Sequence, residues 1–255
     1  MPLTLTPLQG YPLVKSGDDL VDLTVQALSV SGLTLLPGDV LVFAQKIVSK
    51  AEGRRVNLAT ITPSPRAQEL AHQIEKDPRL VELILRESRT VLRTRPGTIV
   101  VEHRLGFVCA NAGIDHSNVA GEGTAEQEWV LLLPEDPDAS AQRLRDGLQA
   151  HFGVPIGVLI IDSHGRAWRL GTVGVAIGLA GLPALVDLRG KPDLFGYRLR
   201  ITQIGAADEL AAAASLVMGQ AAEGTPVVHV RGFPYPLRES SLAELIRPAD
   251  QDMFR

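Results

Sequence analysis

The apolar segment Ile156–Ile161 constrains the fold more than any other stretch of the sequence. It consists of IGVLII, and the polar residues Asp162, Ser163 and His164 follow it directly. A short, continuous apolar run with polar residues at its end is typical of a buried strand. Other segments show the 3.6-residue apolar spacing of helices. We therefore predict an α+β (mixed α/β) protein with a buried strand that ends at Asp162.

The polar residues after this strand form the first candidate site. A carboxylate and a hydroxyl at the end of a buried strand, here Asp162 and Ser163, are a common arrangement for binding a metal ion or a phosphate. Arg166 and Arg169 follow, and two guanidinium groups beside a carboxylate make a good anion clamp. The alternative is that an arginine pairs with Asp162 and merely holds a loop. His164 is a candidate general base, although a single histidine in a loop is usually incidental.

The segment Gly106–Val119 is the second candidate site. Its sequence, GFVCANAGIDHSNV, begins as a short apolar run and then becomes polar. Asp115 offers carboxylate oxygens, which suit Mg²⁺ and Mn²⁺. Asn111 and Asn118 offer amide groups to the polar edge of a ligand. Because Asn, Gly and Asp are also frequent in turns for backbone reasons alone, a plain turn is the alternative.

Two lysines follow another candidate strand, Val40–Ala44. Lysines at the end of a buried strand, here Lys46 and Lys50, are candidates for phosphate binding as point charges. The alternative is that both are solvated at the surface, which is the usual situation for lysine. The segment contains neither GxxxxGK[ST] nor GxGxxG, so the known phosphate-loop folds receive no support.

The rest of the chain alternates between apolar segments and turn signals. Helices are predicted over 20–28 with a cap at Asp18 or Asp19, over 64–93 in two pieces that begin after Ser64 and Asp77, over 141–152 with a cap at Asp138 or Ser140, over 207–217 and over 239–246. Strands are predicted over 3–5, 98–102, 130–133, 199–204 and 227–230, a packed helix or core segment over 174–186, and an exposed loop over 119–128. Because no repeat or linker is visible, we expect a single catalytic domain over residues 1–255. Two lobes are the alternative, without a boundary that the sequence shows.

Composition excludes several function classes. The 255 residues carry a net charge of −4 and only 4% of them are aromatic, so no surface for nucleic acid is expected. The single cysteine, Cys109, excludes an intrachain disulfide and a Cys-rich zinc site. Its apolar neighbours favour a core position over a nucleophile. We find no signal peptide and no apolar run long enough to span a membrane, and we expect a cytoplasmic protein without a membrane partner.

These residues alone predict an enzyme that uses a divalent cation with a nucleotide or a phosphate. Four longer motifs carry a more specific resemblance, namely QKIVSKAEGR (45–54), GFVCANAGIDHSNV (106–119), DSHGRAWRLGTVGVAIG (162–178) and MGQAAEGTPVV (218–228). In this order they resemble the coenzyme F420-0:L-glutamate ligase (F420 gamma-glutamyl ligase) family, where F420 is a deazaflavin redox cofactor. The resemblance covers most of the chain. The chain resembles the stand-alone form of the family, without the nitroreductase-like domain.

The resemblance implies a GTP-dependent ligase with the family's own fold of mixed sheets and flanking helices, as an intertwined homodimer. Such an enzyme joins L-glutamate to the lactyl carboxylate of F420-0 through an acyl phosphate, and it can add further γ-linked glutamates. It uses two divalent cations (Mg²⁺ or Mn²⁺), with K⁺ as an activator. The protein positions and neutralises the reactants, so no residue is expected to be a covalent nucleophile.

The motifs also imply the site residues. Asp115 and Asp162 are expected to hold one divalent cation, and Ser163 and Gln220 to help hold the second, where relatives can carry Thr and Glu. The glutamine keeps an oxygen donor but lowers the charge of that second site. The residues expected to contact GTP are Leu8, Gln9, Gly10, Tyr11, Pro12, Gln45, Lys46, Lys50, Asn118, Met218, Gly219, Gln220, Ala221, Ala222, Glu223, Gly224 and Thr225. We assign Arg166 and Arg169 to the anionic substrate on their chemistry alone.

Two other function classes are alternatives. The chain could be a non-catalytic GTP- or metal-binding module on the same fold, which would bind GTP without releasing GDP. It could also be a metal-dependent phosphoesterase, which would release phosphate without glutamate.

Overall fold

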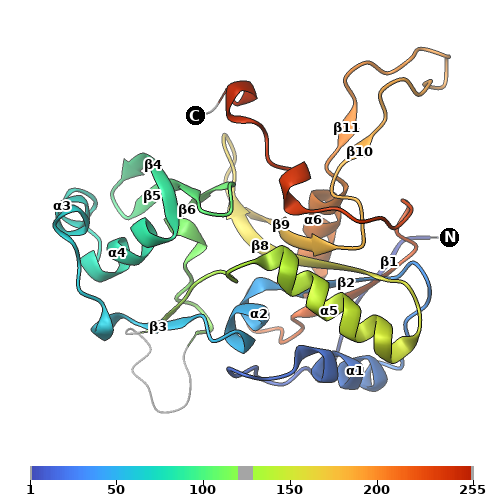
Figure 1. Ribbon diagram of the computed structural model, residues 1–255, viewed down its shortest axis with the longest axis horizontal. Coiled ribbons are helices and arrows are strands. Elements are labelled where there is room, and N and C mark those ends of the chain that lie inside the picture. Colours follow the sequence, from blue (N-terminus) through green and yellow to red (C-terminus); the bar gives the residue numbers. More distant parts are fainter. Residues whose placement is uncertain (1, 120–128, 254–255) are drawn as a thin grey trace.

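A five-stranded mixed sheet lies at the centre of the molecule (Figure 1). The structure, a computed structural model, describes residues 2–119 and 129–253. The strands of this sheet are, in spatial order, β1 (Thr4–Pro7), β12 (Val227–Arg231), β2 (Val40–Ala44), β8 (Gly157–Gly165) and β9 (Thr172–Ala180). β2 and β8 run parallel, and the other neighbours are antiparallel. The α+β class predicted from the sequence is confirmed.

The other elements surround this sheet or extend it at one end. The helices are α1 (Leu20–Val30), α2 (Gln45–Ala51), α3 (Pro65–Ile74), α4 (Pro78–Arg86), α5 (Pro137–Phe152) and α6 (Ala206–Met218), with short 3₁₀ turns η1 (Leu58–Thr60), η2 (Asn111–Gly113), η4 (Leu242–Glu244) and η5 (Ala249–Gln251). The remaining strands are β3 (Arg55–Asn57), β4 (Ser88–Arg95), β5 (Thr98–His103), β6 (Val108–Ala110), β7 (Trp129–Leu131), β10 (Val186–Asp187) and β11 (Gln203–Ile204).

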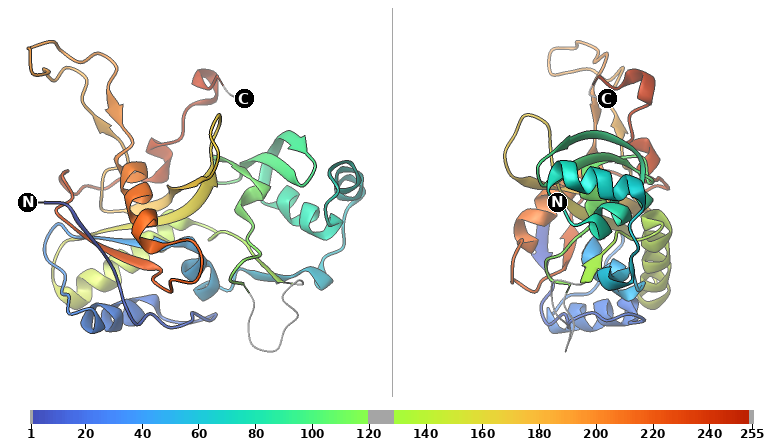
Figure 2. Two further views of the ribbon diagram at one scale, coloured as in Figure 1. Left: turned by 180° about the vertical axis from the view of Figure 1, so that it is seen from behind. Right: turned by 90° about the vertical axis from the view of Figure 1, so that its left-hand side faces the viewer.

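Alternating side chains of the central strands build one core on each face of the sheet. Leu41 and Phe43 of β2 pack with α1 and α5, whereas Val40 and Val42 pack with α6. Figure 2 shows α6 on the face turned away from α5. All four side chains are fully buried, because successive residues of a strand point to opposite faces. Burial on both faces explains why the segment is continuously apolar.

A smaller sheet of β4, β5 and β6 forms a second group of elements with α3 and α4, at one end of the molecule (Figure 1). Its core contains Leu80 and Ile84 of α4 and Ile99 and Val101 of β5. Exposure alternates along β5, with every second residue buried, as expected for a strand with one face on the core.

Most helix starts agree with the sequence, and one differs. Asp19, Ser64 and Asp77 accept hydrogen bonds from the first turns of α1, α3 and α4, as predicted. For α5 the predicted cap, Asp138 or Ser140, is wrong. The helix begins at Pro137 after an Asp136 cap, because proline is favourable at the first helical position.

Three predicted segments need correction, and a fourth is decided between its two alternatives. The end of the predicted 64–93 helix is strand β4, and the predicted helix at 239–246 contracts to η4. Of the predicted strand 199–204, only β11 is formed. The 174–186 segment is mostly buried core, one of its two predicted alternatives, and the helix alternative is wrong because β9 (Thr172–Ala180) extends into it. Its small residues reflect close packing against helices. A Cβ on Gly174 would lie 2.5 Å from the Ala211 carbonyl oxygen of α6, and a Cβ on Gly178 would lie 2.4 Å from Pro137 of α5.

Of the predicted 119–128 loop, residues 120–128 lie outside the described residues. Within the described ranges, no helix combines the length and the apolar character that crossing a bilayer would require.

A buried charged group joins the start of β2 to β12. The Asp39 carboxylate is 2% exposed and accepts hydrogen bonds from His229 Nε2 at 2.7 Å and from Arg231 Nε at 3.0 Å. The Leu36 N–H also donates to it, at 2.9 Å. Burial by itself would raise the pKa of Asp39, but the hydrogen bonds from Arg231, His229 and the backbone lower it below its ordinary value.

We predict that Asp39→Asn lowers the free energy of unfolding at pH 7 by about 3 kcal/mol, because it leaves the buried His229 and the partly buried Arg231 without their anion. The folded-state pKa of Asp39 is lowered, so its contribution is complete above the ordinary aspartate pKa of about 3.9 and is lost as the pH falls through the folded-state value. Urea denaturation from pH 7 down to about pH 3 should show the gap to wild type narrowing. Asp22→Asn, at an exposed position of α1, is the control, and a gap that widens in acid would contradict the assignment.

Candidate active site

The central sheet brings polar residues from separate segments to one edge. Because β2 and β8 are parallel and Ala44 lies opposite Ile161, the residues that follow both positions meet there. β12 starts at the same edge, where the Ala44 N–H donates to the Pro226 carbonyl at 2.9 Å. The 218–225 segment, which leads into β12, therefore reaches this edge as well.

A left-handed turn precedes Asp115. Asn111, Ala112 and Gly113 have φ values of 51°, 53° and 64°, a conformation that costs about 1–2 kcal/mol for each residue with a side chain. Two residues later, Asp115 exchanges two backbone hydrogen bonds with Leu131 of β7, at 2.9 and 3.0 Å. The turn and this bridge together determine where the Asp115 carboxylate projects.

The Asp115 carboxylate is held by two residues of α2. Its Oδ2 lies 2.5 Å from Lys46 Nζ and accepts from Gln45 Nε2 at 2.6 Å. Ser49 Oγ donates to Gln45 Oε1 at 2.8 Å and so orients that amide. Burial raises the pKa of Asp115, the charge of Lys46 lowers it, and repulsion from Asp162 raises it again, so the net direction is upward. The two carboxylates are therefore electrostatically coupled.

Asp162 has the opposite shift. Its Oδ2 lies 3.0 Å from His164 Nε2. Burial alone would raise the pKa of Asp162, but the hydrogen bond and charge of His164, the Ser163 N–H and the charge of Lys46 lower it below the ordinary value. Asp162 is thus the carboxylate of the pair that is stabilised as an anion.

The residues expected at a second cation are in direct contact. Ser163 Oγ donates to Gln220 Oε1 at 2.8 Å, and Gln220 Nε2 donates to Ser215 Oγ at 2.8 Å. Nearby, Asn118 Nδ2 donates to the Ala221 carbonyl at 3.2 Å. These bonds connect the β8 end, the Gly106–Val119 segment and the 218–225 segment.

A cavity of about 700 Å³ opens between these elements. The expected residues that line it are Tyr11, Pro12, Gln45, Lys46, Lys50, Asn118, Asp162, Ser163, Met218, Gly219, Gln220, Ala221, Ala222, Glu223, Gly224 and Thr225. Asp115 is not a lining residue but contacts two of them, Gln45 and Lys46.

Besides Asp115, five expected residues lie outside the lining of this cavity. Leu8 is fully buried in the core, and Gln9 is exposed, with its N–H bound to Ser31 Oγ; Gly10 follows them. Arg166 and Arg169 are exposed between β8 and β9. Among the described residues, no ion pair joins either arginine to Asp162, so the alternative of a loop-holding pair is not seen.

Comparison with known proteins decides the family. The F420-0:gamma-glutamyl ligase family matches residues 10–232. The chain belongs to this family. It is 49% identical to the coenzyme F420:L-glutamate ligase of Methanothermobacter thermautotrophicus over the full length of both chains. It is 46% identical to the Methanopyrus kandleri ligase of the same name, over 99% of this chain and 98% of the relative. With the Archaeoglobus fulgidus ligase the identity is 42%, over 100% and 97%. The chain is therefore a ligase of coenzyme F420 biosynthesis.

Three further polar side chains of this ligase line the cavity and were not among the residues predicted from the sequence. They are His116, Ser117 and Ser215. His116 and Ser117 stand next to Asp115 in the polar part of its segment, so their position could have indicated them. Ser215 lies in the Ala-rich helix α6, where nothing in the sequence distinguishes it.

Other expectations are resolved by burial. Cys109 is a buried core residue, as predicted. Burial, together with the nearby Asp162 charge, raises the pKa of its thiol to about 12. Lys46 and Lys50 are half-buried at the cavity instead of being fully solvated. Burial lowers the pKa of Lys50, with a smaller effect of neighbouring cations. Asn111 has a structural role. It lies in the left-handed turn before Asp115, and its side-chain oxygen accepts from the Ile99 N–H of β5 at 3.2 Å.

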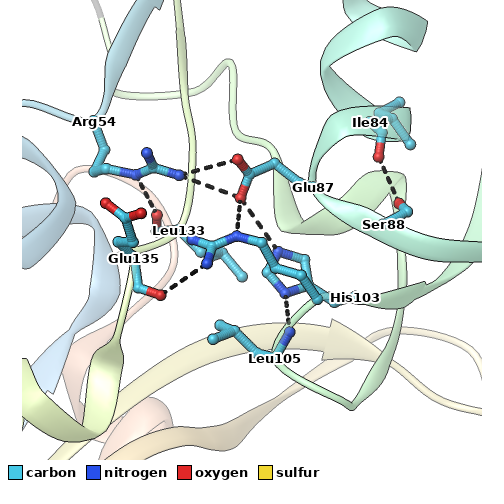
Figure 3. Close-up of polar contacts among 9 residues, drawn as sticks. Arg54, Ile84, Glu87, Ser88, His103, Leu105, Leu133 and Glu135 are labelled. Atoms are coloured by element: carbon cyan, nitrogen blue, oxygen red, sulfur yellow. Dashed lines mark hydrogen bonds and ion pairs between the residues drawn. The ribbon is translucent and has the colours of Figure 1, made fainter.

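A buried charged network around Glu87 lies between the two groups of elements (Figure 3). Glu87 pairs with Arg54 at 3.1 Å and Arg104 at 2.8 Å, and it lies 3.8 Å from His103 Nε2. Burial lowers the pKa of His103 to about 4 although Glu87 opposes this, so the ring is neutral at pH 7. Its Nδ1 accepts from the Leu105 N–H at 3.1 Å, which places the ring proton on Nε2, towards Glu87.

We predict that Gly113→Ala lowers the free energy of unfolding by about 3 kcal/mol, from a left-handed φ together with overpacking. The added Cβ would lie 2.8 Å from Leu133 Cδ1. Gly97→Ala is the matched control, because Gly97 also has a positive φ but open space around it, and it should cost about 1 kcal/mol. Urea denaturation of both variants measures the difference, and equal losses would show that Leu133 does not restrict the turn.

Proposed function

We propose that this ligase joins the amine of L-glutamate to the lactyl carboxylate of F420-0, with GTP as the phosphoryl donor, and adds further γ-linked glutamates to the product. The observation that carries the proposal is the meeting of Asp162, Lys46 and Lys50 at one cavity, with Asp115 ion-paired to Lys46. Carboxylates that bind hard cations, placed beside lysines that bind phosphate, suit phosphoryl transfer. The names of the relatives support the two organic substrates.

The donor set at this edge fits hard divalent cations. Within the described parts of the chain, no three His, Cys, Asp or Glu side chains form a metal-binding group. The candidate donors are two carboxylates with a hydroxyl and an amide oxygen, and Mg²⁺ in nucleotide sites commonly takes one or two carboxylates plus phosphate oxygens. Asp115 and Asp162 would hold one ion, and Ser163 and Gln220 would help hold the second. Bound cations would neutralise charge on the phosphate oxygens. A role for K⁺ stays a prediction from the resemblance.

The proposed reaction has two steps. A carboxylate oxygen of F420-0 attacks the γ-phosphorus of GTP, which forms an acyl phosphate and releases GDP. The glutamate amine then attacks the acyl carbon, phosphate leaves, and an amide bond remains. Lys46 and Lys50 stabilise charge on the transferred group, and the 218–225 segment with Tyr11 and Pro12 surrounds the nucleotide. The buried, protonated thiol of Cys109 takes no part, in agreement with a reaction that needs no covalent nucleophile.

We predict that Asp115→Asn and Asp162→Asn each lower product formation at least 100-fold without unfolding the protein, because a lost metal carboxylate affects function more than packing. Mass spectrometry of the product from F420-0, L-glutamate, GTP and Mn²⁺ measures the reaction and counts the glutamates added. Glu69→Gln, which removes an exposed charge on α3, is the control.

The same assay separates the alternatives. Near wild-type turnover in either aspartate variant would contradict the metal assignment. Binding of GTP without release of GDP in the complete mixture would favour a non-catalytic module. Phosphate release that needs no glutamate would favour a phosphoesterase.

We also propose that the ligase is a homodimer. Leu194 and Phe195, between β10 and β11, are 98% and 95% exposed, and Trp168 and Leu170, between β8 and β9, are 89% and 98% exposed. Figures 1 and 2 show the β10–β11 hairpin projecting from the body of the molecule. Water-exposed apolar side chains of this size are typical of a protein interface. A projecting arm that carries them suits an intertwined second copy.

We predict that the double substitution Leu194→Ser and Phe195→Ser converts a dimer to a monomer, because it removes apolar area from the arm. Size-exclusion chromatography with light scattering measures the mass. Val30→Ser is the control, since Val30 is 67% exposed at the end of α1, away from the arm. A wild-type chain that elutes as a monomer would refute the proposal.

A further inference from the structure

The imidazole of His164 contacts Asp162, one of the two carboxylates of the proposed metal site. The sequence suggested a loop position, but β8 continues through Gly165, and His164 pairs with Val173 of β9. Asp162 and His164 are two residues apart on a strand, so their side chains project from the same face. His164 Nε2 lies 3.0 Å from Asp162 Oδ2, and both side chains are nearly buried, at 11% and 12% exposure.

The aromatic ring of Phe107 packs against His164. The Phe107 ring lies 5.3 Å from the His164 ring, between centroids, and it stacks on His103 at 5.1 Å with an interplanar angle of 7°. His103 in turn contacts the Glu87 network of Figure 3. A continuous set of contacts thus runs from Glu87 through His103 and Phe107 to His164. Packing of this kind restricts the rotamers open to the imidazole.

These contacts distinguish between two roles for His164. A general base must reach a substrate proton, but His164 is not among the residues that line the cavity, and its Nε2 is engaged by Asp162. A donor on Oδ2 instead fixes the orientation of the carboxylate towards a bound cation. Hydrogen bonds of this kind to a ligating carboxylate typically strengthen metal binding 10- to 100-fold.

We propose that His164 is a positioning residue that donates a hydrogen bond to Asp162 Oδ2 and so orients this carboxylate for a divalent cation. The contacts with Phe107 and, through it, His103 keep the imidazole in place. This inference rests on the proposed role of Asp162 as a metal-binding residue, and it adds a residue that the motif-based assignment did not include.

The test is a Mn²⁺ titration of the complete, substrate-free protein, followed by electron paramagnetic resonance, with thermal unfolding measured in parallel. His164→Phe keeps an aromatic ring against Phe107 but removes the donor, and it should weaken Mn²⁺ binding at least 10-fold. His164→Gln restores an N–H donor and should bind Mn²⁺ within about threefold of wild type. His72→Gln, which removes an exposed histidine on α3, is the control and should leave binding unchanged.

Each result decides the matter. Wild-type affinity in His164→Phe, or an equal loss in the Phe and Gln variants, overturns the proposal. If His164→Phe does not fold, His164→Leu, which also lacks a donor, replaces it: a loss of at least 10-fold that His164→Gln does not share supports the hydrogen bond, and wild-type affinity overturns it. Wild-type Mn²⁺ binding in Asp162→Asn would refute the metal site itself. Loss in that variant alone, with His164→Phe unaffected, would refute only the role of His164.

Discussion

In a parallel pair of strands both chains leave the sheet at the same edge, and in this ligase that pair is β2 and β8. Ala44 lies opposite Ile161, so the start of α2, with Lys46, faces the polar end of β8, with Asp162. A one-residue shift of this register would turn Asp162 to the other face of the sheet. The apolar residues on both faces of β2 and β8 hold the register, because any shift would expose them.

Charge balance at this edge depends on Lys46. The carboxylates of Asp115 and Asp162 repel one another, and the Lys46 ammonium offsets this repulsion at both. Under the proposed function, a divalent cation bound between the carboxylates would take over that task. Lys46 would then become available to a phosphate group, so the binding of cation and nucleotide would be energetically linked.

The buried apolar strands and the polar residues that follow them were predictable from the sequence. The burial of Val40–Ala44 and Ile156–Ile161, the core position of Cys109 and three helix caps follow from local patterns. The secondary structure of the segment with β9 was ambiguous. Its residues are small because the strand packs closely against α5 and α6, and no local sequence pattern reveals this packing. The position of Ser215 at the cavity and the contact between His164 and Asp162 depend on how strands and helices pack, so local sequence patterns did not reveal them.

The position of β12 has a consequence for how the chain becomes active during synthesis. β12 (Val227–Arg231) lies between β1 (Thr4–Pro7) and β2 in the central sheet. β1 and β2 are synthesised early, but both pair with β12, which is synthesised late. Strand pairing over such a long sequence separation slows folding. The N-terminal part of the chain is also synthesised first. The 218–225 wall of the cavity directly precedes β12. A chain that has not been synthesised beyond residue 217 therefore lacks this wall of the cavity, although Lys46 and Asp162 are already present.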